Sequence, residues 1–225
     1  MIIKESKFLA TEEKGEVSAI LMRPENASWL LVLAHGAGAG MRHRNLETIA
    51  NRLAEAGVAT FRYQFPYMER GGGRDSRVVT LATVRAAVSA AQQAAGDLPM
   101  LAGGHSFGGR MTSTAASEAP LPNVRGIVFF SFPLHPPGKP GIERADHLND
   151  VNLPMLFLSG DRDKLAELDL LQPVCKKLGA NATLHILETA DHGFKILKRT
   201  RTNPEDVYSE MARKINEWIS KLPQP

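Results

Sequence analysis

Residues Gly104–Gly108, with the sequence GHSFG, are the stretch that decides how this chain folds. An apolar run at Leu98–Ala102 precedes them and a segment compatible with a helix follows, so the local prediction is a strand, a sharp turn and a helix. In such a turn a G-x-S-x-G pattern forces the serine into a strained backbone conformation, and the flanking glycines remove Cβ atoms that would collide. Ser106 is therefore predicted to project above the edge of a sheet as a nucleophile, the alternative being a serine that only caps a helix.

A serine hydroxyl is a poor nucleophile at neutral pH and needs a histidine base oriented by an acid. Residues 151–159 are predicted to form a buried strand, and the loop after it contains Asp163, the predicted acid, and Asp161, the alternative in the same loop. A further strand is predicted at 181–187, and His192 follows it in a loop beside a glycine. His192 is the predicted base, so the three residues occur in the order Ser, Asp, His.

Four other histidines are weaker candidates for the base. His105 lies inside the turn itself, where its side chain is expected to point away from that of its neighbour Ser106. His185 falls within a predicted strand and His147 within an irregular segment. His35 follows the strand at 29–34, and we expect it to hydrogen-bond the loop backbone.

Several ordered motifs resemble those of the α/β-hydrolases, most closely the small dienelactone-hydrolase-like proteins, including the group related to testis-expressed protein 30. The resemblance covers most of the chain, from LVLAHGAG at 31–38 and FRYQFPY at 61–67 to GHSFGG, SGDRD and ADHGF. The order Ser, Asp, His is also that of the α/β-hydrolases. Their G-x-x-D spacing, counted from Gly160, favours Asp163 over Asp161. The resemblance implies a hydrolase fold and an acyl-enzyme mechanism, but no particular substrate.

The same resemblance implies an oxyanion hole made of two backbone N–H groups. One belongs to Phe107, just after the nucleophile, and the other to Ala37 in the HGAG turn. That turn departs from the HGGG of many lipases, so Gly38 is the alternative donor. This chemistry requires no metal and no organic cofactor. The glycines at 36, 38 and 40 do not have the spacing of a dinucleotide-binding loop.

Length and composition predict a single domain over residues 1–225, which the resemblance implies is an α/β-hydrolase domain. The chain is 43% hydrophobic with a net charge of +3, so it can bury a core and nucleic-acid binding is not required. Its single cysteine, Cys175, cannot form an internal disulfide. No apolar run approaches the roughly 20 residues that span a bilayer. We expect a cytoplasmic protein that does not bind membranes and whose partner is a small-molecule ester.

Strands that alternate with helices predict a mostly parallel, doubly wound sheet of about seven or eight strands, with helices on both faces. Two short antiparallel strands are expected within 1–23. Further strands are expected at 29–34, 58–63, 98–102, 124–130, 151–159 and 181–187, with helices at 45–56, 77–95, 107–119 and 204–222.

The segment 133–150, where a lid would lie in this fold, is short and begins with a stretch rich in Pro and Gly. We therefore predict a minimal lid and small or soluble esters as substrates. Tyr67 and Met68 are predicted to line the pocket. Arg42, beside the oxyanion turn, belongs with Arg70 and Arg74 to a set of basic residues that would suit a carboxylate-bearing substrate, although solvated charges are the favoured interpretation.

Two other functions use the same features. A protein can retain the fold and act only as a binding or scaffolding module, but the presence of a complete serine, acid and base argues against this. An acyltransferase would form the same acyl-enzyme and differ only in the acceptor that enters second.

Overall fold

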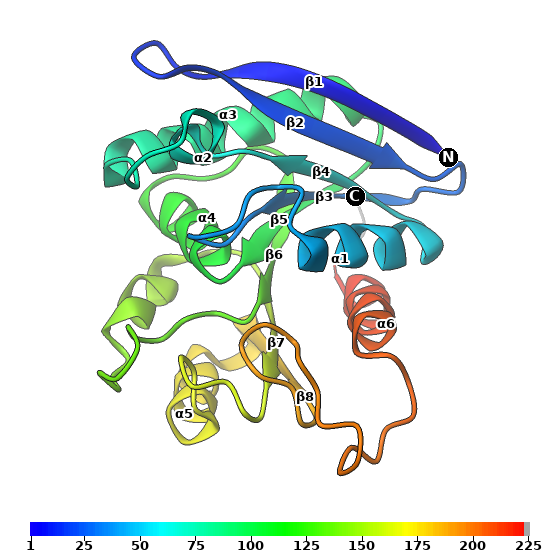
Figure 1. Ribbon diagram of the computed structural model, residues 1–225, viewed down its shortest axis with the longest axis vertical. Helices are drawn as coiled ribbons and strands as arrows, with labels where there is room; N and C mark the ends of the chain where they lie inside the picture. The colour runs from blue at the N-terminus through cyan, green and yellow to red at the C-terminus, as the bar shows by residue number, and fades with distance from the viewer. Residues whose placement is uncertain (223–225) are drawn as a thin grey trace.

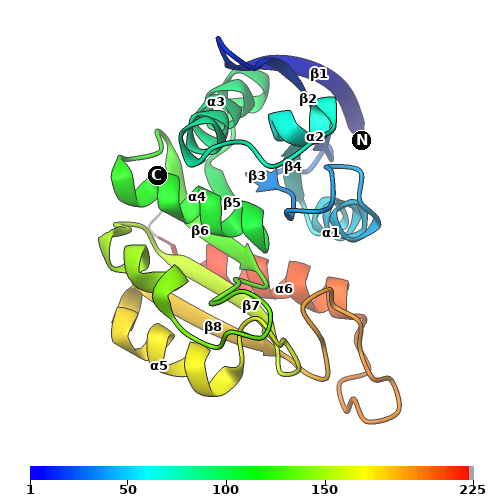
Figure 2. The same ribbon diagram turned by 60° about the vertical axis from the view of Figure 1, so that its left-hand side comes forward.

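The computed structural model describes residues 1–222, in which eight strands form a single sheet. Their order across the sheet is β1-β2-β4-β3-β5-β6-β7-β8. The pairs β1/β2 and β2/β4 are antiparallel and every other pair is parallel. Both views place β1 at one edge and β8 at the other (Figure 1, Figure 2). The strands are β1 Ile2–Thr11, β2 Gly15–Arg23, β3 Trp29–Ala34, β4 Val58–Tyr63, β5 Met100–His105, β6 Val124–Phe130, β7 Met155–Gly160 and β8 Ala182–Leu187.

Helices cover both faces of this sheet. The α-helices are α1 Arg44–Glu55, α2 Pro66–Arg70, α3 Arg77–Ala95, α4 Phe107–Glu118, α5 Leu168–Leu178 and α6 Val207–Ile219, and the 3₁₀-helices are η1 Glu143–Asp150 and η2 Gly179–Asn181. Helices α1 and α6 pack together on one face, while α3, α4, η1 and α5 follow one another across the other (Figure 1). The predicted fold, a mostly parallel sheet between two layers of helices, is confirmed.

Alternation along the central strands explains how the two cores form. In β3, Leu30 and Val32 face the core beneath α3 and α4, whereas Leu31 and Leu33 face the core beneath α1 and α6. All six residues of β3 are buried, as expected for a strand covered on both faces. The carboxyl ends of β3, β5, β7 and β8 therefore lie along the same side of the sheet, which we call its carboxyl edge. The loops that carry the candidate functional residues begin there.

The ends of several elements differ from the predictions, and prolines explain two of the differences. The strand predicted at 98–102 is β5, which begins after Pro99, and the strand predicted at 151–159 is β7, which begins after Pro154. Proline has no N–H to donate to a neighbouring strand. Helix α6 begins at Val207 instead of residue 204, because the Asp206 side chain caps it by accepting a hydrogen bond from the Ser209 N–H at 3.1 Å.

Helix α5 was absent from the predictions. Pro173 lies inside it, and a proline normally argues against a helix. Leu171, Val174 and Cys175 are nevertheless buried at helical spacing, and this pattern is the signal in the sequence that indicates the helix. The stretch rich in Pro and Gly at 133–141 lies outside helices and strands, and η1 follows it. Within residues 1–222 no helix combines the length and apolarity needed to span a bilayer.

Candidate active site

The turn between β5 and α4 has the strained backbone that its sequence predicts. Ser106 has φ 50° and ψ −114°, in a region that residues with a Cβ rarely adopt. Its N–H donates to the Phe130 carbonyl at 3.0 Å, which ties the turn to β6. A Cβ on Gly104 would lie 2.5 Å from the Ala34 carbonyl oxygen, and one on Gly108 would lie 2.6 Å from that of His35. Only glycine allows β5 and α4 to approach β3 this closely.

Ser106, Asp163 and His192 come together at the carboxyl edge of the sheet. Asp163 follows β7 and His192 follows β8, so the parallel strands deliver both loops to the edge where β5 ends. The His192 Nε2 lies 2.8 Å from Ser106 Oγ, and its Nδ1 lies 2.8 Å from one Asp163 oxygen and 2.9 Å from the other. The three side chains form one continuous chain of hydrogen bonds.

Asp163 is buried and held in place, whereas Asp161 is exposed. The Asp163 carboxylate also accepts a hydrogen bond from the Leu165 N–H at 2.8 Å, which fixes its orientation toward His192. Burial of a carboxylate is tolerated when hydrogen bonds satisfy its oxygens. Of the two acids in this loop, the fold places Asp163 against the histidine.

His105 and His35 form hydrogen bonds with the backbone of the loops around the site. The His105 Nε2 lies 3.0 Å from the His192 carbonyl oxygen, so its N–H donates to the backbone of the histidine loop. His35 donates from Nδ1 to the Gly36 carbonyl at 2.8 Å and accepts from the Phe65 N–H through Nε2 at 3.0 Å. Burial lowers the pKa of each of these two histidines to about 4, so both are neutral at pH 7. The sequence did not indicate the role of His105 beneath the loop.

The other two candidates for the base, His185 and His147, have hydrogen-bond partners elsewhere. His185, on β8, has Nε2 2.8 Å from a carboxylate oxygen of Glu210 on α6. His147, on η1, has Nε2 2.8 Å from the hydroxyl of Ser113 on α4. Neither contact involves Ser106, so His192 is the histidine that the fold brings to Ser106.

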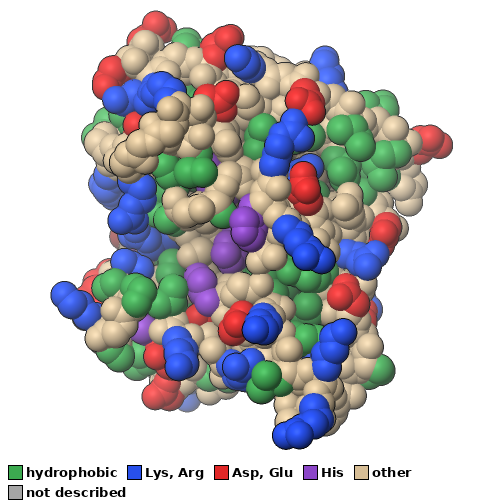
Figure 3. Space-filling view, in the orientation of Figure 1, with side chains coloured by type: hydrophobic (Ala, Val, Ile, Leu, Met, Phe, Trp, Pro, Cys, Tyr) green, Lys and Arg blue, Asp and Glu red, His purple; other side chains and the backbone are tan. Residues whose placement is uncertain are grey.

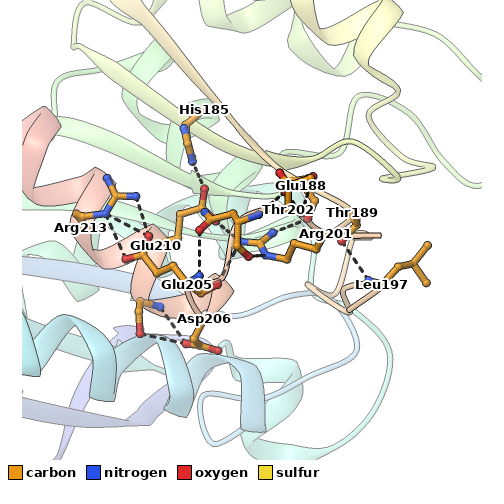
Figure 4. Close-up of polar contacts among 12 residues, drawn as sticks. His185, Glu188, Thr189, Leu197, Arg201, Thr202, Glu205, Asp206, Glu210 and Arg213 are labelled. Carbon is orange, nitrogen blue, oxygen red and sulfur yellow. Dashed lines mark hydrogen bonds and ion pairs between the residues drawn. The ribbon is translucent and has the colours of Figure 1, made fainter. Parts of the chain in front are cut away.

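A network of polar contacts holds the loop that contains His192 (Figure 4). Glu188, at the start of the loop, accepts hydrogen bonds from the Thr202 and Asn203 N–H groups, each at 2.9 Å. Arg201 donates to the Glu188 carbonyl oxygen and pairs with Glu210 of α6. The two ends of the loop are therefore joined to each other and to a helix.

The tip of the same loop is attached to α1 and α6. The Asn45 side chain donates to the Gly193 carbonyl oxygen at 2.9 Å, and the Tyr208 hydroxyl donates to Asn45 Oδ1 at 3.2 Å. Gly193 directly follows His192, so these bonds restrict where the imidazole can lie.

The two predicted oxyanion donors lie on either side of this turn. Phe107 is the first residue of α4, and Ala37 lies in the loop after β3. Among residues 1–222, the N–H groups of Phe107, Ala37 and Gly38 donate to no other residue, so both alternatives for the second donor stay open. The Tyr67 hydroxyl donates to the Ala37 carbonyl at 2.9 Å and thereby orients the Ala37 peptide.

The structure gives the predicted substrate-contacting residues other partners. Tyr67 is buried behind the turn, and burial raises its pKa to about 12. Arg42 forms an ion pair with Glu5 of β1 at 2.6 Å. Met68 is half-buried and packs against the core beneath α3 and α4. The Tyr67 hydroxyl and the Arg42 guanidinium thus both have partners within the protein.

Two hollows border the candidate site. One, of about 440 Å³, lies beside His192 and is lined by Arg162, Leu165 and Lys195. The other, of about 200 Å³, lies beside Phe107. His192 keeps 23% of its side chain exposed, and histidine side chains are visible at the centre of the face shown in Figure 3. A small molecule can thus reach the imidazole.

Residues 27–220 match a family described as an alpha/beta hydrolase domain. This chain belongs to that family. The match spans β3 to α6 and includes all three residues of the hydrogen-bonded chain.

Solved structures with the same fold are distant in sequence. A dienelactone hydrolase from Anabaena variabilis is 19% identical with a TM-score of 0.75, and the match covers 99% of each chain. An α/β serine hydrolase without a lid from Xanthomonas campestris is 17% identical with a TM-score of 0.74, over 99% of this chain and 96% of the other. Est1E from Butyrivibrio proteoclasticus, solved with ferulic acid, is 18% identical with a TM-score of 0.72, over 92% and 96%.

Proposed function

We propose that this protein is a serine hydrolase that cleaves small or soluble carboxylic esters through an acyl-enzyme on Ser106. The observation behind this proposal is the unbroken hydrogen-bonded chain from Ser106 Oγ through His192 to Asp163. A binding module that retained only the fold would have no use for this alignment.

In the proposed reaction, the Ser106 hydroxyl attacks the ester carbonyl carbon while His192 Nε2 takes its proton. The tetrahedral intermediate collapses, the C–O bond to the alcohol breaks, and the imidazolium returns the proton to the leaving alkoxide. Water then repeats the sequence on the acyl-enzyme and releases the acid. Asp163 accepts the Nδ1–H hydrogen bond throughout, which fixes the tautomer and stabilises the imidazolium.

The negative charge that develops on the carbonyl oxygen needs preset donors. The Phe107 N–H lies at the beginning of α4, where the helix dipole also favours negative charge. Ala37 supplies the second N–H, with Gly38 as the alternative. Tyr67, bonded to the Ala37 carbonyl, keeps this peptide in place before substrate arrives.

The preference for small esters rests on the short segment at 133–150. Its helix η1 packs against α4, and the hollow beside His192 measures about 440 Å³. Similar structures include a dienelactone hydrolase and a serine hydrolase without a lid, which agrees with an enzyme of this kind.

Labelling with a fluorophosphonate tests the proposal directly. We expect stoichiometric modification of the wild-type protein at Ser106, located by mass spectrometry, and its loss in Ser106→Ala and His192→Ala. Ser117→Ala is the matched control and keeps full labelling, since Ser117 lies on α4, the helix after the turn at residues 104–108 that we call the elbow. If the folded wild-type protein stays unlabelled, or if the adduct lies on another residue, the proposal is wrong.

A panel of p-nitrophenyl esters tests the substrate size. We expect kcat/KM to fall as the acyl group lengthens from acetate to palmitate, because the short protein segment 133–150 can cover little of a long acyl group. A clear preference for the long chains would contradict this part of the proposal.

A further inference from the structure

Arginine side chains gather around Phe107, the residue that follows the nucleophile. The guanidinium carbons of Arg74 and Arg110 each lie 5.9 Å from the centre of its ring. Both arginines line the hollow of about 200 Å³ beside it. Arg144 lies on η1, which packs against α4, the helix of Arg110, and His147 of η1 has Nε2 2.8 Å from the Ser113 hydroxyl of α4. Three distant segments of the chain therefore bring positive charge to one side of the elbow, and Lys and Arg side chains crowd one margin of the face in Figure 3.

These three arginines have no acidic partner in the described part of the chain. No carboxylate of residues 1–222 lies within 4.0 Å of the guanidinium of Arg74, Arg110 or Arg144. The Arg110 Nε is buried and, within the same residues, has no hydrogen-bond partner. Within the described residues, the Arg110 guanidinium is thus neutralised by no carboxylate and bonds to no acceptor at Nε.

The two other charged side chains that line the hollow already have partners within the protein. Arg77, which also lines the hollow, pairs with Glu118 at 2.7 Å. Asp75 is the carboxylate of the hollow; it accepts a hydrogen bond from the Tyr67 N–H at 2.7 Å and lies 3.5 Å from Arg70. The Asp75 carboxylate oxygens are thus already engaged, since one also lies 3.9 Å from Lys14 Nζ.

The arginines also repel one another. Burial, and then the charges of Arg144 and Arg74, lower the pKa of Arg110 to about 10. Burial and the charge of Arg74 also lower the pKa of Arg144. Like charges held together without a counterion destabilise the fold, and a bound anion would relieve this cost.

We propose that Arg74, Arg110 and Arg144 bind a substituent of the substrate that has two negative charges, with a phosphate monoester as the chemical class that fits best. A guanidinium group donates paired hydrogen bonds to phosphate, and three such groups are better neutralised by a dianion than by a single carboxylate. Arg110 lies one helical turn from Ser106, since its N–H donates to the Ser106 carbonyl at 3.1 Å. The inference rests on the proposed function and specifies its substrate as a short ester with an anionic group near the reacting carbonyl.

Three matched p-nitrophenyl esters, whose acyl chains end in a methyl, a carboxylate or a phosphonate group, test this specificity. For the wild-type protein we expect kcat/KM to be highest for the phosphonate. In Arg110→Gln and in Arg144→Gln, the ratio of kcat/KM for the phosphonate to that for the neutral ester should fall about tenfold. Arg125→Gln removes the same charge from β6, at its far end from the elbow, and should leave the ratio unchanged.

Binding of inorganic phosphate to Ser106→Ala protein, measured by calorimetry at constant ionic strength, separates the two proposals. We expect Arg110→Gln and Arg144→Gln each to weaken this binding about tenfold and Arg125→Gln to leave it unchanged. If Ser106 is labelled and neutral esters are cleaved, but phosphate binding and the substrate ratio do not respond to Arg110 or Arg144, the arginine site is wrong and the hydrolase stands. If Ser106 is not labelled but phosphate binding depends on both arginines, the site stands as an anion site and the hydrolase is wrong.

Discussion

The His105 Nε2 lies 3.0 Å from the carbonyl oxygen of His192, so the last residue of β5, which precedes Ser106, is directly bonded to the loop that contains the His192 imidazole. The two rings are also in contact, with centroids 5.4 Å apart. His105 thereby couples the positions of two residues that are 86 positions apart in the sequence, Ser106 and His192.

Substitution of His105 should lower catalysis without removing any reacting group. In His105→Ala the His192 loop loses one support, and a small displacement of the imidazole should reduce kcat by about ten- to a hundredfold. His105→Gln keeps a donor and should recover part of the rate. Steady-state kinetics on a neutral ester measures both, and equal activity of wild type and His105→Ala would show that the contact does not position the base.

The proposed role of Asp163 predicts a large and specific loss. Asp163→Asn should reduce kcat by about ten-thousandfold, because an amide cannot hold the imidazole in the required tautomer. Asp161→Asn, at an exposed position two residues away, is the matched control and should have little effect. A comparable loss of kcat in both variants, or a larger loss in Asp161→Asn, would show that the assignment of the acid to Asp163 is wrong.

The close approach of the elbow to β3 makes Gly108 sensitive to a single methyl group. A Cβ there would lie 2.6 Å from the His35 carbonyl oxygen, so Gly108→Ala should lower the free energy of unfolding by about 1–3 kcal/mol. Gly73→Ala adds the same methyl group where no atom lies within 4 Å. Urea denaturation compares the two variants, and an equal change in both would argue against steric strain at the elbow.

The ion pair between Arg201 and Glu210 should stabilise the protein far more than the exposed pairs on α6. The side chains of Arg201 and Glu210 are only 3% and 5% exposed, so Arg201→Met leaves a buried charge and should cost about 3–5 kcal/mol. Arg213, 44% exposed, pairs with Glu205, and Arg213→Met should cost about 0–1 kcal/mol. The difference in unfolding free energy between the variants is the measurement, and similar losses would contradict the prediction.

Stability should decrease as the pH falls from about 6.5 to about 4. Burial lowers the pKa values of His35, His105 and His147 to about 4, below the value of 6.5 in the unfolded chain. In this window the unfolded state binds protons that the folded state does not, so each histidine reduces the unfolding free energy by up to about 1.4 kcal/mol per pH unit. Urea denaturation at several pH values should show a shallower dependence in His147→Gln than in wild type. An unchanged slope would contradict the assignment for His147.

Much of the architecture was predictable because its signals are local. The continuous apolar run of β3 indicates a strand covered on both faces, and α3 begins and ends at the predicted residues because Ser76 caps it and Gly96 follows it. Helix α5 was missed because Pro173 is a local signal against a helix, whereas the burial of Leu171 and Val174 that stabilises it comes from packing.

The identity of the candidate site was also readable in part. Ser106, the loop that contains Asp163 and the loop that contains His192 each follow a predicted strand, and the ends of parallel strands meet at one edge. The structure distinguishes Asp163 from Asp161 more clearly than the sequence does, because only Asp163 is buried and bonded to His192. Both properties depend on how β7 and β8 are paired.

Local sequence is enough to predict the class of fold, the elbow and the order of Ser106, Asp163 and His192 along the chain, because strand and helix periodicity and the glycines of a tight turn act over a few residues. Three relationships depend on the packed structure: Arg42 pairs with Glu5, the Tyr67 hydroxyl bonds to the Ala37 carbonyl, and Arg74 and Arg110 converge beside Phe107. These contacts join segments far apart in the chain. They depend on the register of the sheet and the packing of helices upon it, which no local pattern specifies.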